Sequence, residues 1–350
     1  LKLFTVPELV AFKSRLNGKS LADSISNEEL TDWLHLPTNN IVLREMFYNF
    51  IRVLSNFPLV KDGFDNVTGI GILKSIVLID HARCRKYVDT KSYDPARLMF
   101  IALSTSKTTK EDYESSISSP SGDSLNVVSS FKNYNKIAVD DLTIPATYLQ
   151  EFLAWLLLLT THCPTNNCKF PGDYIYAKWS TYKSSATSLL RSMDPSFTPN
   201  GELHFITYKQ FSNVIKTIIP DIFAPLERAM EHLLYQESDL VAFDFQNNLS
   251  SSKLINQALI AQLSTSLTKE LSFSKLQKLY VGAESGFSMR SLQAKVFKWM
   301  APTIILISGK CILNDEEYFV KNPRYKKFLQ EFPKLKDSDQ HLNEHQLKKN

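Results

Sequence analysis

The residue types that most often bind metals or carry out catalysis are scattered along this chain. The densest group is Cys163 and Cys168, which lie five residues apart, with His162 beside the first of them. A structural zinc site needs four such ligands, and no further cysteine or histidine stands near this trio. The four cysteines are also too sparse for a disulfide framework and suit a reducing compartment; they are Cys84, Cys163, Cys168 and Cys311. We therefore predict free thiols, no metal and no cofactor.

No spacing in the sequence pairs a nucleophile with a base. Gly286-Phe287-Ser288 begins like the G-x-S-x-G turn of serine hydrolases, but position 290 is an arginine and the second glycine is missing. The seven histidines are dispersed, and no glycine-rich phosphate-binding loop occurs among the ten glycines. We predict a protein that is not an enzyme. The alternative left open is an enzyme whose catalytic groups come from distant parts of the sequence.

The segment from Asp194 to Phe211 is a candidate calcium site. Its second half, Ile206 to Phe211, resembles the exit half of an EF-hand, in which a loop isoleucine is followed by a helix. Aligning Ile206 with the eighth loop position places non-carboxylate residues at positions one, three, five and twelve, namely Pro199, Gly201, Leu203 and Gln210. Calcium loops need carboxylates at most of these positions. We therefore predict an EF-hand-like scaffold that binds no calcium.

Hydrophobic periodicity predicts a mainly helical first part of the chain. Apolar residues recur at helical spacing in seven segments, several of which begin or end at a proline or a capping residue. The predicted helices are Pro7–Leu16, Leu43–Phe57, Gly71–Val88, Tyr148–Thr161, Ser184–Met193, Thr207–Ile219 and Pro225–Tyr235. The longest apolar run, Phe152–Leu159, is far shorter than the roughly 20 residues that span a bilayer, so it predicts a core helix.

A more specific pattern lies near the end of the chain. Ser288 is placed to cap a helix running to Ala301, with Phe287 and Leu292 positioned as a hydrophobic staple. Pro302 ends that helix, and Thr303–Ile307 has no polar alternation. We predict that these five residues form a strand buried on both faces, onto which the helix packs.

These residues resemble the opening of a TLDc domain. The motif consists of structural positions, and they are Gly286, Phe287, Ser288, Leu292, Trp299 and Pro302. Longer strings, GFSMRSLQAKVFKWMAP from Gly286 and NPRYKKFLQEFPKLK from Asn322, resemble the fungal TLDc proteins named for restriction of telomere capping. The resemblance implies an α+β domain in which helices pack on a β-sandwich. It also implies that this chain carries only the first part of that domain and lacks the family's acylated leader.

The predicted organisation is therefore mainly α, with two domains. Residues 1–252 form a helical, EF-hand-like domain with a mobile insertion near 104–126. Residues 253–350 form the first part of a TLDc domain, following a polar linker at 244–253 and ending in a charged, disordered tail from about 336.

The resemblance also implies a function. TLDc proteins are associated with the vacuolar proton-pumping ATPase and with protection against oxidative stress. We expect a cytoplasmic regulatory or adaptor protein that binds subunits of this ATPase and associates peripherally with the vacuole membrane. The net charge of +4, from nearly balanced acids and bases, disfavours direct nucleic-acid binding. The alternatives are an enzyme of oxidative-stress protection, a calcium sensor, a calcium-independent scaffold and a DNA-binding protein.

Overall fold

The computed structural model describes most of the chain as two compact units. The described residues are 1–58, 66–88, 93–106, 137–162, 173–199, 201, 203–236, 254–267, 278–301, 303–309 and 320–331. The first unit comprises Leu1–Asn247 together with Gln257–Thr268, and the second comprises Asn248–Asn256 together with Lys269–Asn350. We call them the helical unit and the C-terminal unit. The predicted insertion (104–126, beyond Ser106), linker (244–253) and tail (from 336) lie outside the described residues.

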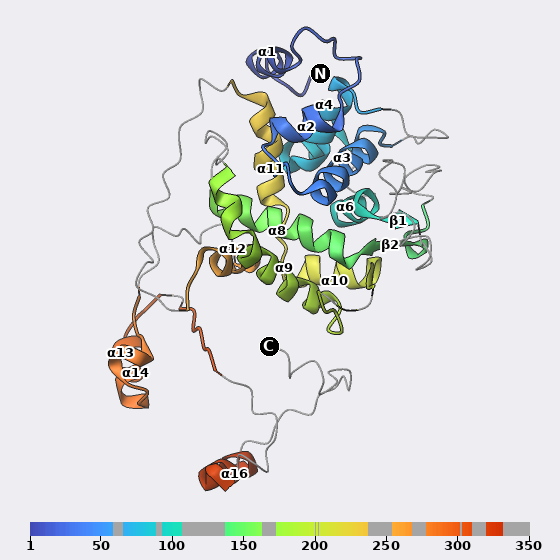
Figure 1. The fold of residues 1–350 in the computed structure, drawn as a ribbon. Helices are drawn as coiled ribbons and strands as arrows, with labels where there is room; N and C mark the ends of the chain where they lie inside the picture. Colours follow the sequence, from blue (N-terminus) through green and yellow to red (C-terminus); the bar gives the residue numbers. More distant parts are fainter. Residues whose placement is uncertain are drawn as a thin grey trace. The chain divides into compact units, whose positions relative to one another are not determined.

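The described part of the helical unit is mostly α-helix, as the periodicity predicted (Figure 1). In chain order its described helices are α1 (Val6–Arg15), α2 (Asn27–Trp33), α3 (Ile41–Ser55), α4 (Gly69–Ile79), α5 (His81–Tyr87), α6 (Pro95–Leu103), α8 (Ala146–His162), α9 (Trp179–Met193), α10 (Tyr208–Thr217), α11 (Ala224–Glu231) and α12 (Gln257–Ser266). Short 3-10 turns are η2 (Val139–Asp141), η3 (Asp173–Lys178) and η4 (His232–Leu234). The mainly helical fold class is confirmed.

Helix α8 lies at the centre of this unit (Figure 1) and packs against α3, α9, α11 and α12. Its residues 152–159 are buried on all sides, which explains why their sequence is uniformly apolar. Aromatic rings fix its contact with α3: Trp155 lies edge-on to Phe47 at 5.2 Å between centroids, and Phe152 lies 5.5 Å from Phe50. No described helix of the chain is both long and apolar enough to cross a bilayer.

Side-chain caps set several helix starts. Thr5, Ser26 and Thr207 each form a capping box with the residue three positions on, and Asp80 and Asp94 accept backbone N–H bonds at the starts of α5 and α6. The cap at Asp80 corrects one prediction. Gly71–Val88 was expected to be one helix, but the Asp80 carboxylate binds the N–H groups of Ala82 and Arg83 and starts a second helix there.

A small antiparallel sheet precedes α8 and α10. Its strands are β1 (Thr105–Ser106), β2 (Leu142–Pro145) and β3 (Phe205–Thr207), in the order β1-β2-β3. Strand β2 leads directly into α8, and β3 leads directly into α10. Because β2 and β3 run antiparallel, α8 and α10 start from opposite ends of this strand pair.

The C-terminal unit contains α13 (Gly282–Ser285), α14 (Met289–Val296) and α16 (Pro323–Glu331) among its described residues. The predicted strand is wrong, because residues 303–309 have neither helical nor strand structure, and Ile305 and Ile307 are 69% and 85% exposed. A strand satisfies the hydrogen bonds of its backbone only by pairing with a neighbouring strand. No described residue of this unit belongs to a strand. Helix α14 also ends at Val296, before the predicted Ala301.

Helix α12 lies beyond the boundary expected at residue 252, yet it packs on α8 and α9 of the helical unit. The linker was placed by its polar composition, and composition does not report where the next helix docks. Its buried residues, which include Ala258 and Ala261, contact the core of the helical unit.

Candidate functional site

The two strand-to-helix corners of the small sheet form the most regular feature of the helical unit. Ile144 of β2 lies opposite Ile206 of β3, and both side chains are fully buried. The N–H of Ala146, the first residue of α8, donates to the carbonyl of His204 at 2.9 Å. Two helix–strand–helix corners are thus paired antiparallel, with one isoleucine from each in the core.

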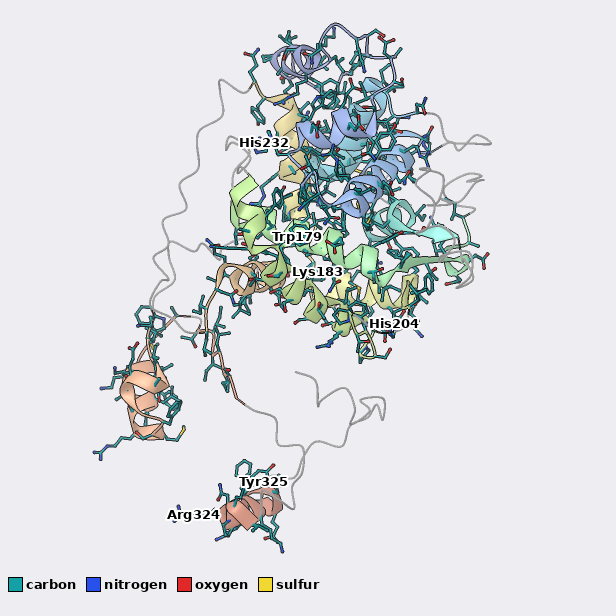
Figure 2. The ribbon with its side chains drawn as sticks, viewed as in Figure 1. Trp179, Lys183, His204, His232, Arg324 and Tyr325 are labelled. Carbon is teal, nitrogen blue, oxygen red and sulfur yellow. The ribbon has the colours of Figure 1, made fainter. Side chains whose placement is uncertain are left out.

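The loop between α9 and β3 is closed by the Asp194 carboxylate. One oxygen, Oδ1, accepts hydrogen bonds from the backbone N–H of Ser196 at 3.0 Å and from its hydroxyl at 2.6 Å. The other, Oδ2, lies 2.9 Å from Nδ1 of His204, which stands just before β3 (Figure 2). Burial alone would raise the pKa of Asp194, but the hydrogen bonds from Ser196 and His204 outweigh it and hold that pKa below its ordinary value.

The ring of His204 is held from a second side. Phe197 packs edge-on against it at 5.7 Å, and Nε of Arg191 donates to the Phe197 carbonyl at 3.2 Å. Because Asp194 and His204 are only 16% and 18% exposed, this contact is a sheltered one. We call Asp194, Ser196 and His204 the loop clasp.

In the EF-hand alignment Gln210 stands at the position of the last calcium ligand, but its side chain caps a helix instead. Its Oε1 accepts hydrogen bonds from the N–H and hydroxyl of Thr207, at 2.9 and 2.8 Å, in the capping box of α10. Among the described residues, no group of three histidine, cysteine or acidic side chains could hold a metal. Cys163, Cys168 and Cys311 lie outside the described residues, and Cys84 is buried with its pKa raised by desolvation.

The loop clasp contains serine, histidine and aspartate, but it lacks the geometry of a catalytic triad. A triad uses both imidazole nitrogens, one toward the carboxylate and the other toward the serine. Here Nδ1 of His204 faces both Asp194 and, at 3.5 Å, the Ser196 hydroxyl. Ser196 also donates directly to Asp194. The three residues therefore stabilise a turn, and the serine is not activated as a nucleophile.

A second polar cluster ties α8 to its neighbours. The Glu151 carboxylate accepts hydrogen bonds from Nδ2 of Asn40 at 2.8 Å and from Nε1 of Trp179 at 3.0 Å, and it forms an ion pair with Lys183. Trp179 and Lys183 are one turn apart on α9 (Figure 2). This cluster has a structural role, since each donor comes from an element that packs on α8.

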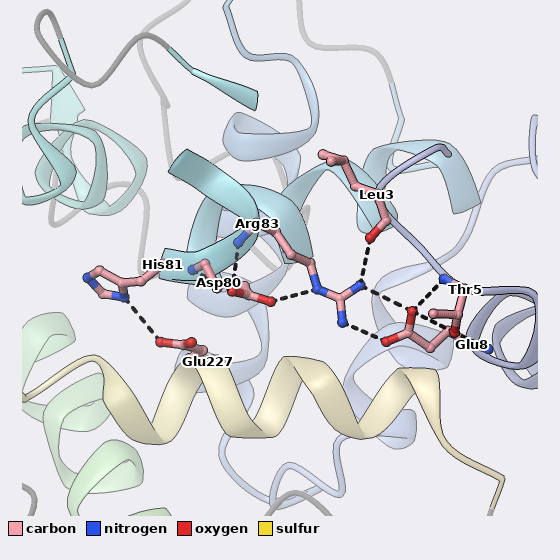
Figure 3. Close-up of polar contacts among 8 residues, drawn as sticks. Leu3, Thr5, Glu8, Asp80, His81, Arg83 and Glu227 are labelled. Carbon is pink, nitrogen blue, oxygen red and sulfur yellow. Dashed lines mark hydrogen bonds and ion pairs between the residues drawn. The ribbon is translucent and has the colours of Figure 1, made fainter. Parts of the chain in front are cut away.

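A third cluster fixes the N-terminal segment (Figure 3). The Arg83 guanidinium contacts Glu8 of α1 and Asp80 of its own turn, each at 2.6 Å, and donates to the Leu3 carbonyl at 3.2 Å. It also lies over the Phe4 ring, 4.8 Å from its centroid. Burial alone would raise the pKa of Glu8, but bonding to Arg83 and Thr5 holds it below its ordinary value.

Nearby, Nδ1 of His81 lies 3.1 Å from the Glu227 carboxylate on α11, as Figure 3 also shows. One turn further along the chain, Glu231 is the acid most affected by this environment. Burial, followed by the charges of Asp80 and Glu227, raises the pKa of Glu231 to about 7. Sequence reasoning missed this acidic cluster because its members come from α1, α5 and the end of α11.

Four of the predicted TLDc motif residues lie at the turn between α13 and α14 or in the first turn of α14: Gly286, Phe287, Ser288 and Leu292. Gly286 adopts φ +80°, a left-handed conformation that favours glycine, and Ser288 caps α14 by accepting from the Ser291 N–H at 3.1 Å. The predicted cap is confirmed. Ser285 strengthens the turn, because its carbonyl and hydroxyl accept from Ser291 and Lys295.

The apolar motif residues are not brought into a core. Phe287 is 90% exposed, and a Cβ added at Gly282 would lie 2.5 Å from its ring, so the ring covers Gly282 and does not staple Leu292. Leu292 is half-buried and Trp299 is 41% exposed. Pro302 lies outside the described residues. The motif therefore supplies a capped turn whose apolar side chains lie largely in solvent.

Comparison with known proteins defines the class first. Residues 248–340 match the family model described as TLDc domain. The resemblance seen around the capped turn is thereby confirmed for these residues.

Fungal proteins are similar to this chain over nearly its whole length. The chain is 51% identical over 341 residues to Restriction of telomere capping protein 5 of Zygosaccharomyces rouxii, covering 97% of this chain and 61% of that protein. It is 47% identical over 349 residues to the protein of that name in Saccharomyces cerevisiae, covering 99% and 61%. The protein of that name in Lachancea thermotolerans is 42% identical over 346 residues, covering 98% and 62%. The chain thus spans about three fifths of the length of these relatives, and no solved structure matches it.

Proposed function

We propose that this chain is part of a non-enzymatic regulatory or adaptor protein that binds the vacuolar proton-pumping ATPase and biases its assembly state. The observation that carries the proposal is the TLDc match at residues 248–340 in a chain about half identical to Restriction of telomere capping protein 5. TLDc proteins are associated with this pump, and the similarity therefore implies the same partner for this chain. An effect on telomere capping, which the relatives' name suggests, would then be indirect.

The mechanism is differential binding. A protein that binds one assembly state of a multisubunit pump more tightly shifts the equilibrium toward that state by its affinity ratio. A shift from about 1:99 to 99:1 requires a preference of roughly 10⁴, and smaller preferences give proportionate shifts. No covalent chemistry is needed, which agrees with a loop clasp whose serine donates to Asp194.

The helical unit acts in this proposal as a calcium-independent, EF-hand-like scaffold. The antiparallel pairing of Ile144 with Ile206 supports it, because paired EF-hands join their loops through a short strand at this position. The contact between Asp194 and His204 supports it too, since it closes the loop with the protein's own side chains. The scaffold would hold its shape whatever the calcium concentration.

The TLDc segment supplies the main partner contact. Several of its apolar side chains are highly exposed, including Phe287 at 90% and Met300 at 97%. Exposed aromatic and methionine side chains of this kind are enriched in protein interfaces.

We place the protein in the cytoplasm, peripheral on the vacuole membrane. An acylated leader of the kind found in this family would give only marginal binding by itself, because a single acyl chain anchors weakly. Stable recruitment would therefore need the protein contact with the pump.

The test uses the full-length protein in its own fungal cells. The tagged protein is purified under gentle conditions, and pump subunits are quantified in the eluate. In parallel, the ratio of the pump's soluble to membrane sectors on isolated vacuoles is compared between cells with and without the protein. We expect pump subunits in the eluate and a changed ratio.

A pair of matched variants locates the contact. Phe287→Ser removes an exposed apolar side chain of the TLDc segment, and Tyr87→Ser removes one from α5 of the helical unit. We expect the first to reduce recovery of pump subunits and the second to leave it unchanged. Absence of those subunits together with an unchanged sector ratio would refute the proposal, and salt-dependent binding to duplex DNA would favour a direct telomeric role instead.

A further inference from the structure

The sequence contains two Asn-Gly pairs, Asn17-Gly18 and Asn200-Gly201. In such a pair the backbone nitrogen of glycine can attack the side-chain amide carbon of asparagine, because glycine has no Cβ to obstruct the approach. A nitrogen–carbon bond forms, the amide nitrogen leaves as ammonia with the proton of the attacking nitrogen, and a five-membered succinimide results. Water then opens this ring to aspartate or isoaspartate. Since the two dipeptides are identical, a large difference between their rates in the folded chain must come from their surroundings.

The first pair lies in an open turn directly after α1. Asn17 and Gly18 are both exposed, and both have left-handed backbone conformations, with φ +48° and +89°. Asparagine and glycine are the residues that tolerate this conformation best. A Cβ added at Gly18 would have no atom within 4 Å. The reacting groups and the water that opens the ring therefore meet no steric obstacle here.

Neither reacting group of this pair is held by a hydrogen bond. The hydrogen bonds of the turn belong to its neighbours: the N–H of Leu16 donates to the Lys13 carbonyl at 3.1 Å, and the N–H of Lys19 donates to the Leu16 carbonyl at 2.9 Å. The side-chain amide of Asn17 and the N–H of Gly18 make none with the described part of the chain. The nitrogen can therefore attack without first breaking a contact.

The attacking nitrogen of the second pair is engaged. The N–H of Gly201 donates to the Thr198 carbonyl at 3.1 Å, in the loop between α9 and β3 that the loop clasp closes. A Cβ added at Gly201 would lie 1.9 Å from Oγ1 of Thr198, so the threonine side chain packs directly on this glycine. Attack by the Gly201 nitrogen requires that this hydrogen bond be broken and the threonine moved.

We propose that the turn at Asn17-Gly18 is a deamidation site, and that the fold selects it over the identical pair at Asn200-Gly201. The amide of Asn17 is replaced by a carboxylate, which lowers the net charge of the chain by one, and ammonia is released. Water is the co-reactant, and no protein group is needed as catalyst. The isoaspartyl product is a substrate for the class of enzymes that transfer a methyl group from S-adenosylmethionine to an isoaspartyl carboxylate.

Other asparagines of the helical unit serve as internal controls. Nδ2 of Asn40 donates to Glu151 at 2.8 Å, and Nδ2 of Asn56 donates to the Arg52 carbonyl at 2.8 Å. Isoleucine and phenylalanine follow these asparagines, so the attacking nitrogen also carries a bulky neighbour. Both should keep their amides while Asn17 converts.

The first test follows both Asn-Gly pairs in the unaltered 350-residue chain at mildly alkaline pH, which favours deprotonation of the attacking nitrogen. The chain is digested after lysine in ¹⁸O-water, and peptides 14–19 and 184–209 are weighed; conversion before digestion adds about 1 Da and conversion during digestion about 3 Da. In the folded chain Asn17 should convert at least ~5-fold faster than Asn200, the factor that one net hydrogen bond supplies. In urea the two rates should be similar. The same ratio in the folded chain as in urea would overturn the proposal.

Matched variants provide the second test. Asn17→Gly removes the amide and keeps the turn, because glycine adopts φ +48° freely. After incubation, isoaspartate is labelled by an isoaspartyl methyltransferase with radioactive S-adenosylmethionine. We expect label in peptide 14–19 of the unaltered chain and of Asn200→Gly, and none in that peptide of Asn17→Gly. Label confined to peptide 184–209, or absent from both peptides of the unaltered chain, would contradict the proposal.

Discussion

Replacing Arg83 by methionine tests how the N-terminal helix is held. Arg83 is 17% exposed and makes short contacts to Glu8 and Asp80, whose side chains are 18% and 6% exposed. Methionine keeps much of the apolar stem, so the substitution removes mainly the charge and its hydrogen bonds. Glu8 and Asp80 would then lose their shared cation beside Glu231, a third acid.

The expected loss follows from the degree of burial. An exposed ion pair contributes about 0–1 kcal/mol, and breaking a fully buried pair costs about 3–5 kcal/mol. The Arg83 contacts lie between these limits, which gives about 2–3 kcal/mol. For a unit of this size, a loss of that magnitude lowers the Tm by roughly 5–10 °C.

The assay is thermal unfolding by circular dichroism, with hydrogen exchange to locate the change. Arg85→Met is the matched control, because Arg85 is on the same helix but exposed, and it should cost less than about 0.5 kcal/mol. Protection should fall first in α1, and a double-mutant cycle with Glu8→Gln should give a coupling of about 1–2 kcal/mol. If Arg83→Met and Arg85→Met destabilise the protein equally, the reasoning is wrong.

Three further predictions follow from the polar clusters. Because the pKa of Glu231 is raised to about 7, its unfolded form releases a proton that the folded form retains, and stability falls as pH rises from about 4.5 to 7. After discounting for partial exposure, this loss of stability amounts to about 1 kcal/mol. In calorimetry, Glu231→Gln should therefore raise the Tm at pH 8 and leave it unchanged at pH 4. The same gain in Tm at both pH values would contradict the prediction. In urea unfolding at pH 7, His204→Ala should lower the free energy of unfolding by about 1 kcal/mol. This loss should shrink as pH falls through the lowered pKa of Asp194, because the protonated carboxyl no longer accepts from His204. A loss that does not depend on pH would point to packing alone. The Tm should be the same in about 1 mM calcium as in the presence of a chelator. A higher Tm in calcium would mean that the loop binds the ion.

The prediction of helices from sequence succeeded where the signal was local. The start of α14 follows from Ser288, and the central position of α8 follows from the uniformly apolar run at 152–159. Caps and periodicity act within a turn or two of the residues that produce them. The same locality explains why the TLDc resemblance could be read from short strings.

Predictions that depended on distant partners fared worse. Thr303–Ile307 has a strand-like composition but no described strand beside it, and the Asp80 carboxylate divides what periodicity predicted as one helix. The kinship does not depend on that strand, because it is shown by sequence identity over nearly the whole chain. A motif can therefore identify a family even where its local conformation requires residues elsewhere.

The sequence by itself determined the helical class, the capped turn at Gly286 and Ser288, and the relationship to fungal TLDc proteins. Only the tertiary structure decided that Ile144 pairs with Ile206, that Arg83 joins α1 to α5, and that α12 docks on α8 and α9. Each of these contacts joins residues distant in sequence, and local side-chain types and spacing do not reveal which distant surfaces meet. That choice is made by the packing of the whole core, in which many weak contacts must be satisfied together.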